Sequence, residues 1–246
     1  MLLRFYQGQK VSKGNRPLLI AHGGGNGEFP DNTLEAFYNA YDIDPNVMME
    51  TDVSITKDGV VILSHDTTLD RKTNLKNTPI IDVNYADLIR DEVDFSYQNK
   101  VVPESNGFNI SGELIRYKTF AGDSVTPLDV NYPTGVSPRH SEVFLATTLE
   151  ELIIAFPNNK INVEIKQEKE TGLLALDAVI QLMDDLDEQY NTYGRIVLAS
   201  FHKEIFSELE ARHRSDSRLM YSPAVEGVVK FYIMHALSIV ALYKDK

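Results

Sequence analysis

The feature that most constrains the fold is an alternation of short apolar strands with helix-length amphipathic segments, which is most regular from residue 147 onward. Strands and helices that alternate at this spacing form βα units. Such units build a parallel sheet, either open or closed into a barrel. The expected strands are 17–23, 47–55, 161–166, 195–201 and 218–223, and the expected helices in the regular part are 147–156, 172–186, 203–213 and 226–243.

Local signals place three further features. "PDNTLEAFYNAY" predicts a helix with Asn32 as its N-cap and Glu35 three positions on, as in a capping box. Asp58-Gly59 between extended segments predicts a hairpin. Residues 67–143 are polar, irregular and rich in proline, so we expect a long insertion after the second strand. No linker divides residues 1–246, and a single domain is expected.

Charged side chains share one face of two predicted strands. Alternation along a strand places Glu50 and Asp52 on the same side. In "INVEIK" it likewise places Glu164 and Lys166 together, opposite the apolar row. Taken singly, the first pair fits a solvated edge strand and the second fits a structural ion pair. Taken together, three converging carboxylates need a compensating cation, and hard oxygen ligands suit Mg²⁺ or Ca²⁺ better than Zn²⁺.

Two of the six histidines stand apart from the others. His22 and His65 each end an apolar run, "LLIAH" and "VVILSH", and each is followed by turn or loop residues. Both are therefore expected at strand ends, where they can divide acid–base work between a nucleophile and a leaving oxygen. The remaining four are expected to be structural or exposed: His140, His202, His213 and His235.

Composition limits the partners. A formal net charge of -12 argues against nucleic acid and anionic membrane surfaces as ligands, and it suits a divalent cation. The chain has no cysteine, so a metal site must use Asp, Glu or His. The start carries no evident signal peptide. The apolar stretch 228–243 is too short to span a membrane and contains Lys230 and His235. The compartment and the oligomeric state stay open.

The quoted motifs, in order, resemble those of the glycerophosphodiester phosphodiesterases: "IAHGGGNGEFPDNTLEAF", "METDVSITKDGVVILSHDTTLDRKT", "TTLEEL" and "INVEIK". The resemblance is dense over residues 17–75 and looser to about residue 225. It implies a TIM barrel and metal-dependent hydrolysis of a phosphodiester. By position it implies the following roles: Glu50, Asp52 and Glu164 as metal ligands, His22 and His65 as the acid–base pair, and Gly23, Asn32 and Lys166 as substrate contacts.

This sequence departs from the family in two ways. The family usually has an arginine after the first histidine, where this chain has Gly23, so we expect backbone amides of residues 23–27, the metal and Lys166 to hold the phosphate. A TIM barrel has eight strands, and about five core strands are predicted here. We therefore expect a fragment that lacks its last three βα units, roughly 70 residues.

The expected function is hydrolysis of glycerophosphodiesters to an alcohol and sn-glycerol 3-phosphate. The alternatives are a lysophospholipase D or phosphoinositide phospholipase-like enzyme, and a non-catalytic binding module. An apolar rim on the insertion would favour the lipid substrates of the first alternative. The residues do not show which histidine is the acid, which metal binds or which head group is released.

Overall fold

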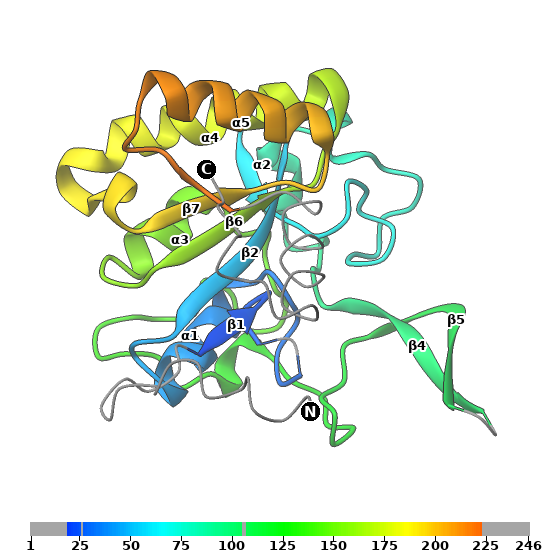
Figure 1. Ribbon diagram of the computed structural model, residues 1–246. Helices are drawn as coiled ribbons and strands as arrows, with labels where there is room; N and C mark the ends of the chain where they lie inside the picture. Colours follow the sequence, from blue (N-terminus) through cyan, green and yellow to red (C-terminus); the bar gives the residue numbers. More distant parts are fainter. Residues whose placement is uncertain (1–18, 26, 105–106, 223–246) are drawn as a thin grey trace, which may run out of the picture.

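The computed structural model of the chain describes residues 19–25, 27–104 and 107–222 (Figure 1). Its strands are β1 (Ile20–His22), β2 (Met48–Ile55), β3 (Val61–Leu63), β4 (Tyr97–Glu104), β5 (Gly107–Arg116), β6 (Ile161–Ile165), β7 (Ile196–Ala199) and β8 (Met220–Tyr221). Its α-helices are α1 (Leu34–Ile43), α2 (Tyr85–Leu88), α3 (Leu149–Ala155), α4 (Lys169–Tyr190) and α5 (Lys203–Ser215). Short 3₁₀ segments are η1 (Ile80–Asp82), η2 (Pro127–Asp129) and η3 (Thr192–Gly194).

The main sheet contains five parallel strands in the order β1-β2-β6-β7-β8, with β3 added antiparallel to β2. The parallel strands therefore neighbour one another in chain order, as successive strands of a βα barrel do. Among the described residues this sheet stays open. The strands predicted around residues 50, 163, 197 and 220 are confirmed, as is the hairpin at Asp58-Gly59, where Gly59 takes a φ of +84°.

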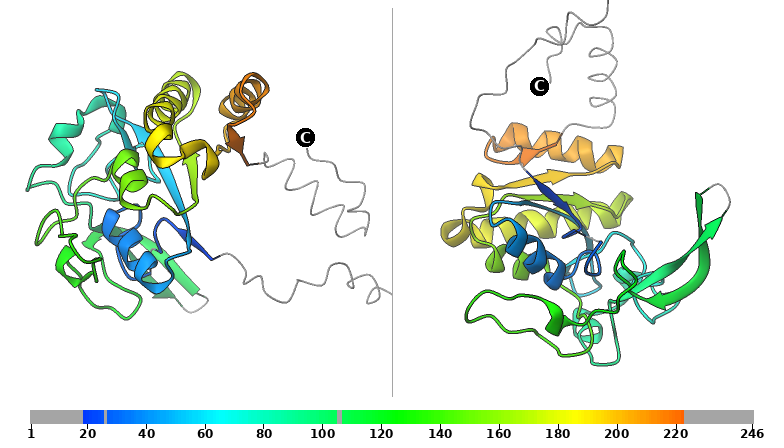
Figure 2. Two further views of the ribbon diagram at one scale, coloured as in Figure 1. Left: turned by 90° about the vertical axis from the view of Figure 1, so that its left-hand side faces the viewer. Right: turned by 90° about the horizontal axis from the view of Figure 1, so that it is seen from below.

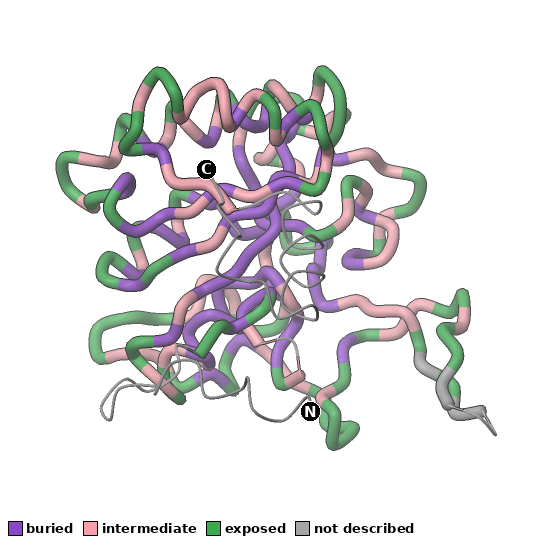
Figure 3. The backbone as a smooth tube through the Cα atoms, in the orientation of Figure 1, coloured by how far each residue is buried: buried purple, intermediate pink, exposed green. Residues whose placement is uncertain are grey.

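The apolar rows of the strands form the core with the helices. Met49 and Val53 of β2 and the isoleucines at both ends of β6 are fully buried, and they belong to one hydrophobic cluster with side chains of α3 and α4. Figure 3 shows this buried region running along the strands through the middle of the molecule. Helices α4 and α5 lie side by side over the sheet (Figure 1). The predicted alternation of strand faces is thus the alternation that packs the core.

The cap of α1 differs from the prediction. Thr33, not Asn32, is the N-cap, and its hydroxyl accepts the amide of Ala36 at 3.3 Å. Asn32 has a φ of +58° and directs its side chain to β2 instead. Glu35 is buried, with its Oε2 3.7 Å from Arg139 Nη2, and it does not close a capping box. Long-range partners on β2 and in the insertion take the two side chains that local spacing assigned to the cap.

The insertion is more regular than predicted. Between β3 and α3 it contains α2, η1 and η2, together with a two-stranded antiparallel sheet of β4 and β5 that projects from the rest of the molecule (Figures 1 and 2). Pro103 argued against a strand, yet both strands of an isolated hairpin are edge strands, which tolerate proline.

The predicted helix 226–243 lies outside the described residues. Within the described ranges, no helix combines the length and apolar character needed to cross a membrane.

Candidate active site and metal centre

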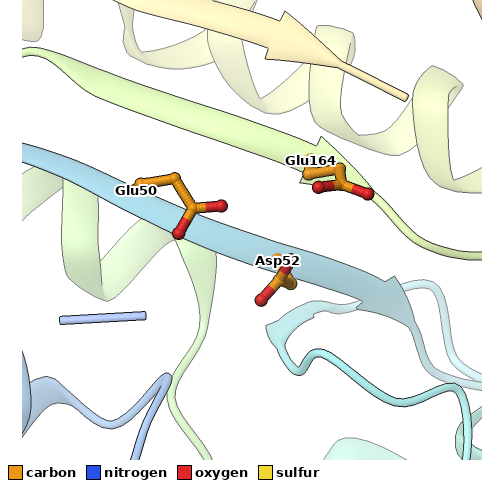
Figure 4. A group of neighbouring side chains, drawn as sticks. All are labelled: Glu50, Asp52 and Glu164. Carbon is orange, nitrogen blue, oxygen red and sulfur yellow. The ribbon is translucent and has the colours of Figure 1, made fainter. Parts of the chain in front are cut away.

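Three carboxylates meet where β2 and β6 run side by side. Glu50 and Asp52 come from β2, and Glu164 lies directly opposite Asp52 in the register of β6. One oxygen from each carboxylate lies within 4.8 Å of the others (Figure 4). The three residues are only 8%, 1% and 9% exposed. Such burial excludes a solvated edge strand as the explanation for these charges.

Lys166 compensates part of this charge. Its Nζ lies 3.0 Å from Asp52 Oδ1 and 2.9 Å from Glu164 Oε1. Burial lowers the pKa of Lys166, but its two carboxylate partners outweigh that effect and the net shift is upward. For Glu50, burial raises the pKa and the charge of Asp52 raises it further. The hydrogen bond from the Gly23 amide and the nearby His22 lower it, but the net shift is upward, which disfavours the charged form. The ammonium therefore neutralises one of three negative charges, and Glu50 is the carboxylate it does not contact.

The remaining charge of -2 and the ligand chemistry fit one divalent cation. All three donors are carboxylate oxygens, which Mg²⁺ and Ca²⁺ prefer. Asp52 Oδ1 is buried and, among the described residues, accepts no hydrogen bond of ordinary geometry although the ammonium is close. A buried acceptor without a hydrogen bond costs folding free energy unless a cation coordinates it. Glu50, Asp52 and Glu164 are thus the residues that would hold the metal.

Asn32 fills a gap along the edge of β2. Strand β1 pairs with β2 as far as Glu50, and β3 begins to pair at Val53. Between them the Asn32 Oδ1 accepts the amide of Asp52 at 3.2 Å and the hydroxyl of Thr51 at 2.7 Å. The Asn32 amide nitrogen donates to Asp52 Oδ2 at 3.1 Å. Asn32 therefore orients a predicted metal ligand, and its role as a substrate contact stays a prediction.

Both predicted acid–base histidines stand at strand ends and line the same pocket. The Nδ1 of His22 lies 2.6 Å from Glu50 Oε2, and the Nδ1 of His65 lies 2.9 Å from Asp66 Oδ1. A carboxylate at Nδ1 favours the tautomer protonated there. Nε2 is then the atom of each ring that exchanges protons with a ligand.

The pocket has a volume of about 270 Å³ and brings in charged residues that the sequence analysis left unassigned. Asp66 accepts His65 on one oxygen and the Nε of Arg71 on the other, the latter at 2.6 Å. Next in the chain, Lys72 is buried and donates to Asp31 Oδ1 at 2.7 Å. Burial raises the pKa of Asp31, but Lys72 and Arg71 outweigh it and bring that pKa to about 2. The lining residues are His22, Gly23, Asp31, Asn32, Asp52, His65, Asp66 and Arg71. Lys166 is not among them.

The glycine loop uses its first amides within the protein. The amide of Gly23 donates to Glu50 Oε2 at 3.0 Å, that of Gly24 to the Ala21 carbonyl and that of Gly25 to the His22 carbonyl. Gly24 also has a φ of +83°, and a Cβ there would lie 2.8 Å from the Cβ of Ala36 on α1. The loop thus binds Glu50 and packs on α1, and three of the amides expected to cradle a phosphate already have acceptors.

Comparison with known proteins now identifies the family. The model of the "Glycerophosphoryl diester phosphodiesterase family" matches residues 22–227, a range that contains all three carboxylates and both histidines. The chain belongs to this family. A curated relative is the human lysophospholipase D GDPD1, which is 28% identical over 205 residues. That match covers 82% of this chain and 51% of the relative, so the chain spans about half the length of such curated relatives.

Solved structures in the family show the same fold. The glycerophosphoryl diester phosphodiesterase domain of a Mycobacterium tuberculosis protein has a TM-score of 0.61 at 18% identity, covering 92% of this chain and 66% of that one. A phosphodiesterase from Oleispira antarctica, solved with the product sn-glycerol-3-phosphate, has a TM-score of 0.54 at 17% identity over 83% of this chain and 64% of that one. The TIM-barrel class predicted from the motifs is thereby confirmed, with the open parallel sheet of the described residues as its observed part.

Proposed function

We propose that the protein hydrolyses glycerophosphodiesters to an alcohol and sn-glycerol 3-phosphate with the help of one Mg²⁺ or Ca²⁺ ion. The observation that carries the proposal is the meeting, in one place, of three buried carboxylates with two histidines that are each held at Nδ1 by a carboxylate. Membership of the phosphodiesterase family and the fold shared with a product-bound phosphodiesterase support it.

The chain's own residues divide the work as follows. Glu50, Asp52 and Glu164 would hold the cation, which when bound neutralises phosphate charge and lowers the pKa of the attacking hydroxyl or water. Of His22 and His65, one takes the proton of the nucleophile on Nε2 as the new P–O bond forms. The other gives its proton to the leaving oxygen as the old P–O bond breaks. Their carboxylate partners keep both rings oriented through the cycle.

Chelation followed by metal restoration tests this proposal. We expect that a chelator abolishes turnover of sn-glycero-3-phosphocholine and that Mg²⁺ or Ca²⁺ restores it, because all three donors are hard oxygens. Asp52→Asn should resist restoration at the concentration that suffices for the wild type. Restoration by Zn²⁺ alone would contradict the ligand assignment, and full activity in the chelator would contradict the metal requirement. Metal binding without any turnover would favour the non-catalytic binding module.

A lysophospholipase D activity is the second candidate, and one structural observation favours it. Phe120, on the insertion, is 93% exposed, and its ring lies against Gly27 of the glycine loop, where a Cβ would meet it at 2.4 Å. An exposed aromatic ring against the glycine loop, whose Gly23 lines the pocket, is the start of the apolar rim that acyl chains need. Phe120→Ser should lower kcat/KM for lysophosphatidylcholine and leave that for sn-glycero-3-phosphocholine unchanged. Equal effects on both substrates would remove this support.

A further inference from the structure

The pocket needs a cationic group for an anionic ligand, and its lining offers one. Asp31, Asp52 and Asp66 bring three carboxylates to the wall, while Arg71 is the one lysine or arginine among the lining residues. Burial lowers the pKa of Arg71, but the charges of Asp31, Asp66 and Asp52 outweigh it, so the guanidinium stays charged. Arg71 therefore gives the pocket wall a permanent positive charge.

The guanidinium of Arg71 is fixed at one edge and open at the other. Its Nε donates to Asp66 Oδ2 at 2.6 Å, and its Nη2 lies 3.8 Å from Asp31 Oδ2, beyond hydrogen-bond distance. Within the described part of the chain, neither terminal nitrogen makes a hydrogen bond. The side chain is 31% exposed, so a ligand in the pocket can reach it. An arginine that is held at Nε still presents donors in the planar arrangement that matches two phosphate oxygens.

Other donors near the pocket already have partners. Lys72 is buried against Asp31, and Lys166 contacts Asp52 and Glu164. The amides of Gly23, Gly24 and Gly25 donate within the protein. Arg71 is thus the cation with unused donors that the pocket presents.

We propose that Arg71 binds a non-bridging oxygen of the substrate phosphate through its terminal nitrogens. The proposal rests on the proposed function and deepens it, because it assigns the phosphate contact that position 23, a glycine, does not supply. Asp66 is then a positioning residue for two groups at once, since it holds Arg71 at Nε and His65 at Nδ1. Phosphate binding and the orientation of one acid–base histidine depend on the same carboxylate.

Arg71→Met tests the proposal, with Arg212→Met on α5 as a matched control. Arg212 has the same side-chain exposure of 31% and also contacts two carboxylates, Glu208 and Asp177, away from the pocket. We expect Arg71→Met to raise KM for sn-glycero-3-phosphocholine about tenfold or more, the range of a lost charged hydrogen bond, with Arg212→Met unchanged. Arg71→Lys should fall between the wild type and Arg71→Met, because it keeps the charge and loses the planar geometry.

A titration with inorganic phosphate in the presence of Mg²⁺ separates this proposal from the proposed function. We expect Arg71→Met to bind phosphate at least about tenfold more weakly than the wild type, with its thermal unfolding midpoint reporting whether it is folded. If the wild type hydrolyses no glycerophosphodiester but shows this difference in phosphate binding, the proposed function fails and the phosphate contact stands. Equal phosphate affinity in the wild type and Arg71→Met, or no binding to the wild type, overturns the assignment of Arg71.

Discussion

Glu50→Gln should separate metal binding from folding more cleanly than any other change in the carboxylate cluster. Glu50 is the ligand that Lys166 does not contact, and its pKa is raised by burial and by the charge of Asp52. Removing its charge leaves both contacts of Lys166 in place. The metal-free protein should therefore lose no stability, although it loses a metal ligand.

The magnitude follows from the spacing of the carboxylates. Unit charges 4.8 Å apart repel by roughly 3 kcal/mol at an effective dielectric constant of about 20. Glutamine accepts the Gly23 amide and contacts His22 less well than a carboxylate does, which costs about 1 kcal/mol for each contact. The free energy of unfolding without metal should thus stay unchanged or rise by about 1 kcal/mol.

Metal should stabilise the variant much less than the wild type. At a metal concentration about 100 times its Kd, the wild type gains about 2.7 kcal/mol of stability. If the lost ligand weakens binding about 100-fold, Glu50→Gln gains only about 0.4 kcal/mol at the same concentration. Urea unfolding with a chelator and with Mg²⁺ measures both quantities, and Glu150→Gln, at an exposed position in the first turn of α3, is the matched control. A large loss of metal-free stability, or an undiminished metal effect in Glu50→Gln, would refute this reasoning.

Three other perturbations have defined outcomes. The pKa of Asp31 is lowered from 3.8 to about 2, so its stabilising contribution, roughly 2 kcal/mol, is fully present above pH 3.8 and is lost as the pH falls through 2. Urea unfolding should accordingly show a stability gap between the wild type and Asp31→Asn that narrows from pH 5 to pH 2, and a constant gap would contradict this. Arg195 is buried and donates to three carbonyls around the end of α3 and to one at the end of α4. Arg195→Met should therefore lower the free energy of unfolding by about 3 kcal/mol in urea titrations, and an effect below about 1 kcal/mol would argue against a stabilising role for these bonds. His22→Ala and His65→Ala should both lose turnover of sn-glycero-3-phosphocholine while their free energy of unfolding stays near that of the wild type. A phosphodiester that releases nitrophenol, which leaves without needing a proton, should rescue only the variant that lacks the general acid. Rescue of both variants or of neither would contradict the division of roles.

The parts of the site that the sequence predicts are those set by strand periodicity. Alternation along β2 and β6 placed Glu50, Asp52 and Glu164 on one face, and parallel pairing then brought Asp52 opposite Glu164. The ends of apolar runs likewise placed His22 and His65 beside the carboxylates. These features depend on a few neighbouring residues and on sheet geometry, which a sequence pattern carries.

The parts that the sequence did not predict depend on contacts between distant segments. Asn32 has the spacing of a helix cap, but a gap in the edge of β2 competes for its side chain. Lys72 reaches Asp31 across 41 residues, and no local pattern indicates that pair. Asp66 and Arg71 stand in the quoted motif "HDTTLDRKT", yet their shared contact appears only when the chain turns back after β3. The one available signal for Asp66 was its position directly after His65, a predicted catalytic histidine.

The most direct test of the central claim is ³¹P NMR product analysis of the chain with sn-glycero-3-phosphocholine and Mg²⁺. We expect a single new phosphorus signal, that of sn-glycerol 3-phosphate, with an equal amount of choline. The signal should be absent in the chelator and in Asp52→Asn. A phosphocholine signal would place the cleaved bond on the other side of phosphorus, and product formation that persists in Asp52→Asn and in the chelator would contradict a metal-dependent site built on β2 and β6.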